Sequence, residues 1–273
     1  NIDLQALTRR QGLNATLSCD LERLDLQALQ LADTTFVLSL CGHFDVATDM
    51  KNTHRVQGLV SDIGLEGTGY QYHPTDLVFS LLADKDTTGV IVDSGDLHLD
   101  ARSGASYQTL LTQADSLLEE SKRQWQARRI DQVRLRERFP DTHLRLSAGQ
   151  DNLLYQYLSS NMDYHFGDIH ADLQSSHVDG LEGYLKVNSL TAAGVQLDAI
   201  DFHVQSERDS ISYHINIKNN KDNPQYVFNA FAEGFLTENG SQITTKLYDE
   251  HGDLGIDLGL AATLEEEGVR FSL

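Results

Sequence analysis

Apolar and polar residues alternate over many stretches of this 273-residue chain, and this alternation restricts the fold more than any other feature. Successive side chains of a β-strand point to opposite faces of the sheet, so a period of two is typical of a strand with one apolar face. Two of the clearest apolar series are Leu13, Ala15, Leu17, Cys19 and Leu21 near the start, and Ile211, Tyr213, Ile215 and Ile217 further on. The pattern predicts a mainly β protein.

Polar segments rich in Gly, Asn and Asp separate the alternating stretches, at residues 33–35, 85–89, 218–224 and 238–240. Such segments are typical of turns, and Asn239-Gly240 is typical of a two-residue hairpin. The strands should therefore pair as antiparallel neighbours in a meander. We predict a long antiparallel sheet that is curled into a taco-like trough, or else an elongated β-sandwich.

The spacing of apolar residues becomes helical between Tyr107 and Phe139, and Pro140 ends the run. A strand at 143–147 and a second short helix at 152–159 should follow. We therefore predict a β-sheet segment at 1–104, one α-helical insertion at 105–160, and a β-sheet segment at 161–273 that continues the same sheet or trough.

The charge balance limits the partners of the chain. Asp and Glu outnumber Lys and Arg by 41 to 21, which gives a net charge of −20. A phosphate backbone needs clustered cations, so we exclude nucleic acid as a partner.

No apolar run approaches the ~18 residues that span a bilayer. The chain starts at Asn1 without a methionine and stops at Leu273 inside an alternating run, so we expect a piece of a longer protein.

Reactive residues are sparse or badly spaced for chemistry. The chain has two cysteines, Cys19 and Cys41, for which a disulfide and two free thiols both remain open. No nucleophile-elbow, phosphate-loop or zinc-protease motif occurs. His165, His170 and His177 lie among aspartates, but their spacing fits no standard ligand set. We therefore predict no enzyme activity, no cofactor and no metal site.

Two histidines allow a more specific expectation. His203 and His214 occupy the polar phase of two alternating stretches. If these stretches pair, the histidines form a cross-strand pair that faces solvent.

Residues 122–138 hold seven of the 21 cations of the chain and only two acids, Asp131 and Glu137. This basic helix has two interpretations: contact with lipid headgroups or a protein partner, or a solvated helix that pairs with the acidic sheet beside it. The cations are Lys122, Arg123, Arg128, Arg129, Arg134, Arg136 and Arg138.

Three stretches carry a resemblance to a known family: residues 77–97, which begin LVFSLLADKD; residues 144–152, LRLSAGQDN; and residues 190–200, LTAAGVQLDAI, with the strand that follows at 211–219. In these strand and turn patterns the chain resembles the TamB/AsmA-like family of envelope proteins, whose architecture is similar to that of bridge-like lipid transfer proteins.

The resemblance implies a β-rich segment of a periplasm-spanning protein that is anchored in the inner membrane of a Gram-negative cell. It also implies transport of phospholipid between inner and outer membranes, with membrane contact through parts that are missing from this chain. A second implied role is a scaffold for outer-membrane β-barrel assembly with TamA, in which exposed sheet edges template another strand.

An apolar trough would bind phospholipid acyl chains through many weak contacts, each buried methylene contributing about 0.8 kcal/mol. Ordinary core packing is the alternative for every such residue, and a closed β-sandwich with an adhesive or carbohydrate-binding role is the alternative for the whole chain. The lining candidates are Phe36, Leu38, Leu40, Phe79, Leu97, Leu99, Phe202, Val204, Tyr213, Ile215, Ile217 and Phe228.

Overall fold

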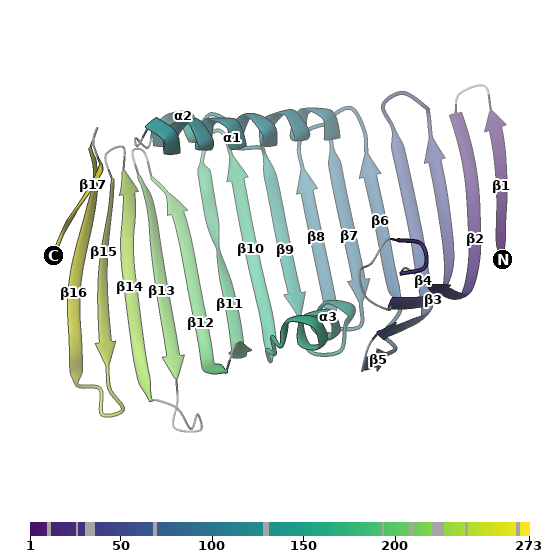
Figure 1. The fold of residues 1–273 in the computed structure, drawn as a ribbon. Helices are drawn as coiled ribbons and strands as arrows, with labels where there is room; N and C mark the ends of the chain where they lie inside the picture. Colours follow the sequence, from purple (N-terminus) through teal and green to yellow (C-terminus); the bar gives the residue numbers. More distant parts are fainter. Residues whose placement is uncertain are drawn as a thin grey trace. The chain divides into compact units, whose positions relative to one another are not determined.

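The computed structural model contains one large antiparallel sheet of 17 strands that is not closed, together with three helices (Figure 1). This confirms the mainly β prediction. The structure describes residues 1–9, 12–25, 27–30, 36–67, 70–127, 131–192, 194–207, 210–219, 227–237, 240–265 and 268–273. The residues group into two compact units, Asn1–Tyr107 with Leu146–Tyr164, and Gln108–Arg145 with His165–Leu273. The division into 1–104, 105–160 and 161–273 stays a prediction.

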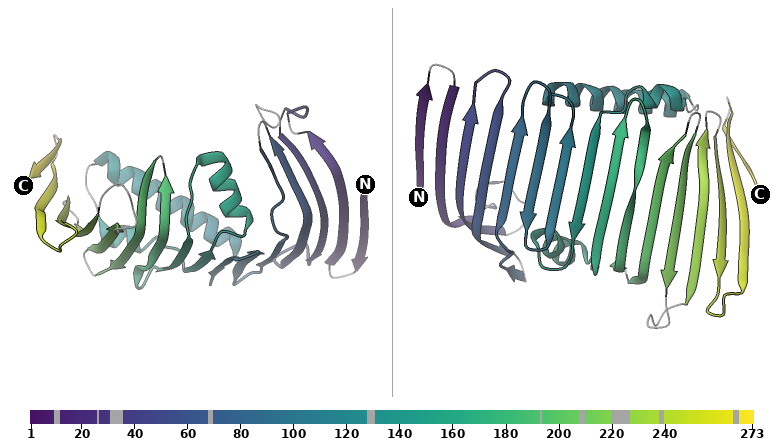
Figure 2. Two further views of the ribbon diagram at one scale, coloured as in Figure 1. Left: turned by 90° about the horizontal axis from the view of Figure 1, so that it is seen from below. Right: turned by 180° about the vertical axis from the view of Figure 1, so that it is seen from behind.

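Eight strands form the sheet of the first unit, and Figure 2 shows the first of them side by side in chain order. Each pairs antiparallel with the next, except that β4 pairs with β5 at one end and with β6 along the rest. The strands are β1 (Ile2–Arg9), β2 (Gly12–Asp25), β3 (Phe36–Thr48), β4 (His54–Gly67), β5 (Tyr70–Tyr72), β6 (Leu77–Ala83), β7 (Thr88–Ser94) and β8 (Leu97–Ser103).

Two irregularities interrupt these ladders on either side of β3. The register shifts between Leu21 and Leu24 of β2, and again on β4 opposite Ser39–Cys41. Each shift inserts one extra residue, as a β-bulge does. On β4 the bulge includes Asp62, which has a positive φ of 51°.

The second unit continues the predicted meander with eight strands. All consecutive pairs from β10 to β17 are antiparallel. The strands are β10 (Asp168–Ser176), β11 (Gly180–Ala192), β12 (Val195–Ser206), β13 (Ile211–Asn219), β14 (Phe228–Thr237), β15 (Gly240–Tyr248), β16 (Leu254–Glu265) and β17 (Gly268–Ser272).

The helical stretch predicted at 107–139 is occupied by two helices, α1 (Tyr107–Ala127) and α2 (Gln132–Arg136). The two helices are separate because Asp131 has an extended backbone and caps α2. Its side chain accepts a hydrogen bond from the Arg134 N–H at 3.0 Å. The predicted strand and second helix are confirmed as β9 (Thr142–Ala148) and α3 (Leu153–Met162).

The start of α3 is fixed to the β7–β8 turn within the first unit. Asn152 is fully buried and caps α3, accepting from the Tyr155 N–H at 2.8 Å. Its amide nitrogen donates to the Asp96 carboxylate at 2.5 Å and to the Gly149 carbonyl at 2.9 Å. Gly95, with φ +58°, is required here because a Cβ would lie 1.7 Å from the Asp151 carbonyl oxygen.

Cys19 and Cys41 are both free and half-buried. The register places Cys19 opposite Gly42, and Cys41 opposite Asp20, so the two thiols point to opposite faces of the sheet. The disulfide alternative is therefore not realised.

Candidate functional site

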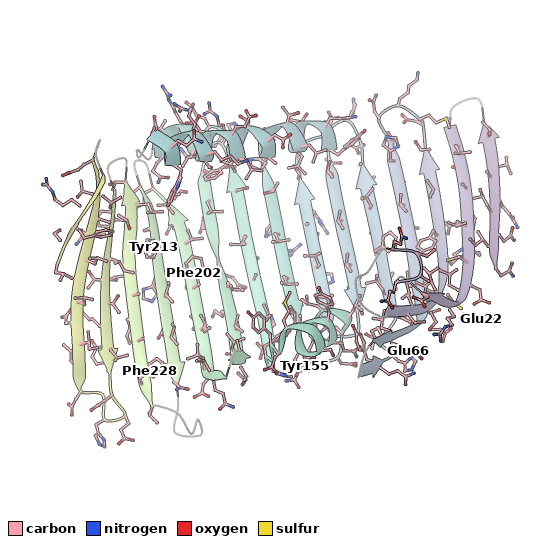
Figure 3. The ribbon with its side chains drawn as sticks, viewed as in Figure 1. Glu22, Glu66, Tyr155, Phe202, Tyr213 and Phe228 are labelled. Carbon is pink, nitrogen blue, oxygen red and sulfur yellow. The ribbon has the colours of Figure 1, made fainter. Side chains whose placement is uncertain are left out.

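The lining candidates of the second unit share one face of its sheet. Directly opposed residues on antiparallel strands point to the same face. Phe202 lies opposite Ile215 and Val204 lies opposite Tyr213. Ile217 follows Ile215 in the same phase, as does Asn219, which lies opposite Phe228. Figure 3 labels Phe202, Tyr213 and Phe228 on three successive strands.

This apolar face extends well beyond the predicted residues. Ladder pairs continue it from β10 to β16, although glycine or alanine at several positions interrupts the row of large apolar side chains. The additional face residues are Ile169, Ala171, Leu185, Val187, Ile200, Ala230, Ala232, Ile243, Leu247, Ile256, Leu258 and Leu260. Their period of two was the signal that could have identified them.

Burial distinguishes this face from a closed core. Val204 is buried, but Phe202, Tyr213, Ile215, Ile217 and Phe228 are only half-buried. Ile256 and Leu258 are 50% and 44% exposed. Two packed sheets would bury their inner faces. In the described part of the chain all strands belong to one sheet that is not closed, and the elongated sandwich stays a prediction. The curl into a trough stays a prediction.

The first unit has an apolar face of its own. Phe79 lies opposite Gly58 and Val92 lies opposite Leu99. The centroids of the Phe44 and Phe79 rings lie 6.1 Å apart, on either side of Gly58. A Cβ at Gly58 would lie 2.5 Å from the Phe79 ring.

The remaining candidates of this unit lie on the same face. Leu97 is buried opposite Ser94, while Leu38, Leu40, Phe79 and Leu99 are half-buried. Phe36 belongs to β3 by its backbone, but its side chain lies outside the described part of the structure.

The opposite face of the second unit is richer in polar residues and carries a hollow of about 620 Å³, which Tyr184 and Phe235 also line. His203 and His214 lie directly opposite each other in this hollow, both exposed, which confirms the predicted cross-strand pair. Glu233 lies opposite His214, and the Tyr184 ring is 5.9 Å from that of His203. Within the residues that the structure describes, no three His, Cys, Asp or Glu side chains are placed to hold a metal ion.

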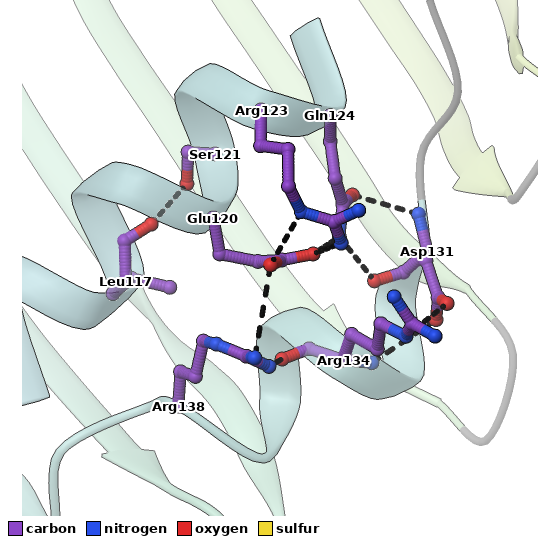
Figure 4. A network of polar contacts seen from close by, with 8 residues as sticks. All are labelled: Leu117, Glu120, Ser121, Arg123, Gln124, Asp131, Arg134 and Arg138. Carbon is purple, nitrogen blue, oxygen red and sulfur yellow. Dashed lines mark hydrogen bonds and ion pairs between the residues drawn. The ribbon is translucent and has the colours of Figure 1, made fainter. Parts of the chain in front are cut away.

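Three cations of the basic helix, Arg123, Arg134 and Arg138, pair with the carboxylates of Glu120 and Asp131 (Figure 4). Glu120 is buried and accepts hydrogen bonds from Arg123 and Gln124, with Arg138 3.7 Å away. Hydrogen bonds from Arg123 and Gln124 lower the pKa of Glu120 to about 2. Arg134 pairs with Asp131 at 3.3 Å. The acidic sheet is therefore not the main partner of these arginines, contrary to the second interpretation.

The other cations of this segment differ. Arg136 donates to the Glu207 carbonyl at 3.4 Å, and Lys122 is exposed. Arg128 and Arg129 lie outside the described residues.

None of the described helices is both long enough and apolar enough to cross a bilayer. Comparison of the chain with protein-family models, with curated proteins and with solved structures found no match.

Proposed function

We propose that this chain is a segment of a periplasmic conduit whose apolar sheet face binds the acyl chains of phospholipids moving between the inner and outer membranes. The full-length protein would be of the TamB/AsmA-like kind, anchored in the inner membrane of a Gram-negative cell. The observation that carries this proposal is the register-matched apolar face from β10 to β16, most of whose residues stay half-buried or exposed, Ala171, Val187 and Val204 being the buried ones.

Such a face suits acyl chains for a physical reason. Exposed apolar surface of this extent is unfavourable in water and marks an interaction site. An acyl chain needs continuous apolar contact and no fixed polar partner, and each methylene that leaves water contributes about 0.8 kcal/mol. The face is built from interchangeable aliphatic and aromatic side chains, such as Phe202, Ile215 and Ile217. These let a chain slide rather than dock in one position.

The test is to express the chain in a bacterial periplasm, purify it without detergent, and quantify extracted phospholipid by mass spectrometry. We expect phospholipid to co-purify in molar amounts comparable to the protein. The double variant F202D/I215D places two negative charges on the apolar face, at residues that lie opposite each other. It should lose the lipid, since an unpaired charge in apolar surroundings is unfavourable.

The matched control is H203D/H214D, which places the same two charges on neighbouring residues of the same strands, on the polar face. It should keep the lipid, and circular dichroism should show that both variants are folded. A folded wild-type chain without phospholipid, or equal lipid in both variants, would contradict the conduit proposal. The barrel-assembly role with TamA would then become the leading one.

A further inference from the structure

Three large apolar side chains on α1 are exposed although the helix is packed along its opposite side. Leu111, Leu118 and Trp125 are 61%, 58% and 86% exposed, whereas Glu120 and Gln124 of the same helix are buried. A single exposed leucine is unremarkable, but three on one helix require an explanation.

The spacing of these residues brings them into one line. They are seven residues apart, close to two full turns, so each is rotated only about 20° from the one before. The line, which we call the α1 stripe (Leu111, Leu118 and Trp125), runs along the solvent side of the helix.

Cations gather at the tryptophan end of the α1 stripe. Lys122 is exposed and lies four residues after Leu118 and three before Trp125, so it borders the stripe on the helix surface. Arg123 and Arg134 pair with carboxylates but remain 54% and 56% exposed. Residues 115–138 hold seven cations and five acids, and the exposed Asp115 and Glu119 lie toward the leucine end of α1, so the excess of cations belongs to the tryptophan end.

We infer that the α1 stripe and Lys122 dock on the surface of a phospholipid bilayer that carries anionic headgroups. An exposed apolar line with a Trp and adjacent cations is the arrangement by which helices lie in the membrane interface. The local charge favours this occupant: Lys122, Arg123 and Arg134 are exposed at the tryptophan end of the stripe, and an anionic lipid surface attracts such a cationic end although the chain as a whole is acidic. This docking surface is separate from the apolar sheet face and does not depend on the conduit proposal.

Trp125 is the only tryptophan of the chain, so its fluorescence reports directly on the α1 stripe. The experiment titrates the whole chain with vesicles of phosphatidylethanolamine and phosphatidylglycerol, and in parallel with vesicles of phosphatidylcholine alone. We expect a blue shift and protection from acrylamide quenching with the anionic vesicles only, and reversal by high salt, which screens surface charge.

Two variants keep the tryptophan. L111S/L118S should weaken vesicle binding at least about tenfold, because two leucines no longer bury apolar surface. K122E should weaken it about fivefold or more, because one cation near the surface is replaced by an anion. The matched control is V178S, at a residue 66% exposed in the β10–β11 turn, which should bind as the wild type does.

Several results would overturn the inference. These are no blue shift with anionic vesicles, an equal shift with phosphatidylcholine, or equal losses in V178S and L111S/L118S. Sedimentation that shows self-association through the α1 stripe without vesicle binding would assign it to a second copy. F202D/I215D separates the two proposals: it should lose co-purified phospholipid and keep the vesicle response. Loss of both would place vesicle binding on the apolar sheet face.

Discussion

At the scale of single residues, Asn152 connects two segments that are 56 positions apart in the sequence. Its side chain caps α3 and donates to Asp96, while Asp96 also accepts from the Asp151 N–H at 3.1 Å. Burial by itself would raise the pKa of Asp96, but hydrogen bonds from Asn152 and the backbone N–H groups of Gly149, Gln150 and Asp151 outweigh it and lower the pKa.

We expect N152A to lower the free energy of unfolding by about 2–3 kcal/mol, because it removes a helix cap and the side-chain donor to the Asp96 carboxylate, which keeps only its backbone N–H donors. Urea denaturation measures the change. The control is N188A, which removes a 2.8 Å bond to Asp168 at an exposed position and should cost less than about 0.5 kcal/mol. Equal effects of the two variants would contradict this account of the cap.

Three aspartates stabilise hairpin turns by accepting hydrogen bonds from backbone N–H groups. Asp49 accepts N–H bonds from Lys51, Asn52 and Thr53, and these bonds lower its pKa to about 2. Backbone N–H bonds likewise lower the pKa of Asp84 in the β6–β7 turn and of Asp249 in the β15–β16 turn.

These shifts predict the pH dependence of stability. A carboxyl group whose pKa is lower in the folded state stabilises the fold above its unfolded pKa and loses that contribution as pH falls through the folded pKa. The wild type should therefore lose stability from about pH 5 to pH 2, and D49N/D84N/D249N should show a flatter profile. Urea titrations across this range measure both. D86N, at a carboxylate paired with Lys85, should leave the slope unchanged; an unchanged slope in the triple variant would refute the role of the turns.

At the scale of elements, Glu120 joins α1 to the segment that contains α2. Gln124 extends the connection, since its side chain accepts from the Asp131 N–H at 2.7 Å and donates to the Asp131 carbonyl at 3.1 Å. The polar face of α1 is thus occupied by bonds within the second unit, which leaves the α1 stripe on the other side.

E120Q should loosen α2, because Arg123 and Arg138 lose the charge that holds them. We expect a lower temperature of unfolding and amide exchange at residues 132–138 that is severalfold faster, measured by hydrogen–deuterium exchange. E119Q, at the exposed neighbour, is the control and should match the wild type. Unchanged exchange in E120Q would show that α2 is held by other contacts.

The sequence predicted most elements because alternation and turn chemistry are local. The strand at 143–147 and the helix at 152–159 were located to within a few residues, and β13 has the bounds Ile211–Asn219 of the expected paired strand. The extra residue at Asp62, the pairing of β4 with β6, and the bond from Asn152 to Asp96 could not be predicted. Each depends on which distant segments meet, and periodicity carries no such information.

At the scale of the whole molecule, the sequence predicted that the candidate site is an apolar sheet face, but not how far this face extends or how exposed it is. Alternation identified Phe202 and Ile215 as residues of one apolar face, and the register confirms that they oppose each other. It could not show that the face remains half-buried, because periodicity does not say what covers a face. The α1 stripe was also missed: its heptad spacing is visible in the sequence, but its exposure is not.

The strand order has a consequence for how such a chain can change and grow. From β10 to β17 each strand pairs only with its sequence neighbours among the described ladders. Duplicating or deleting one hairpin would therefore leave the registers of the others intact, as in repeat proteins with nearest-neighbour interfaces. The length of this sheet could therefore change in evolution by two strands at a time. During translation, each new strand could pair with the strand synthesised just before it.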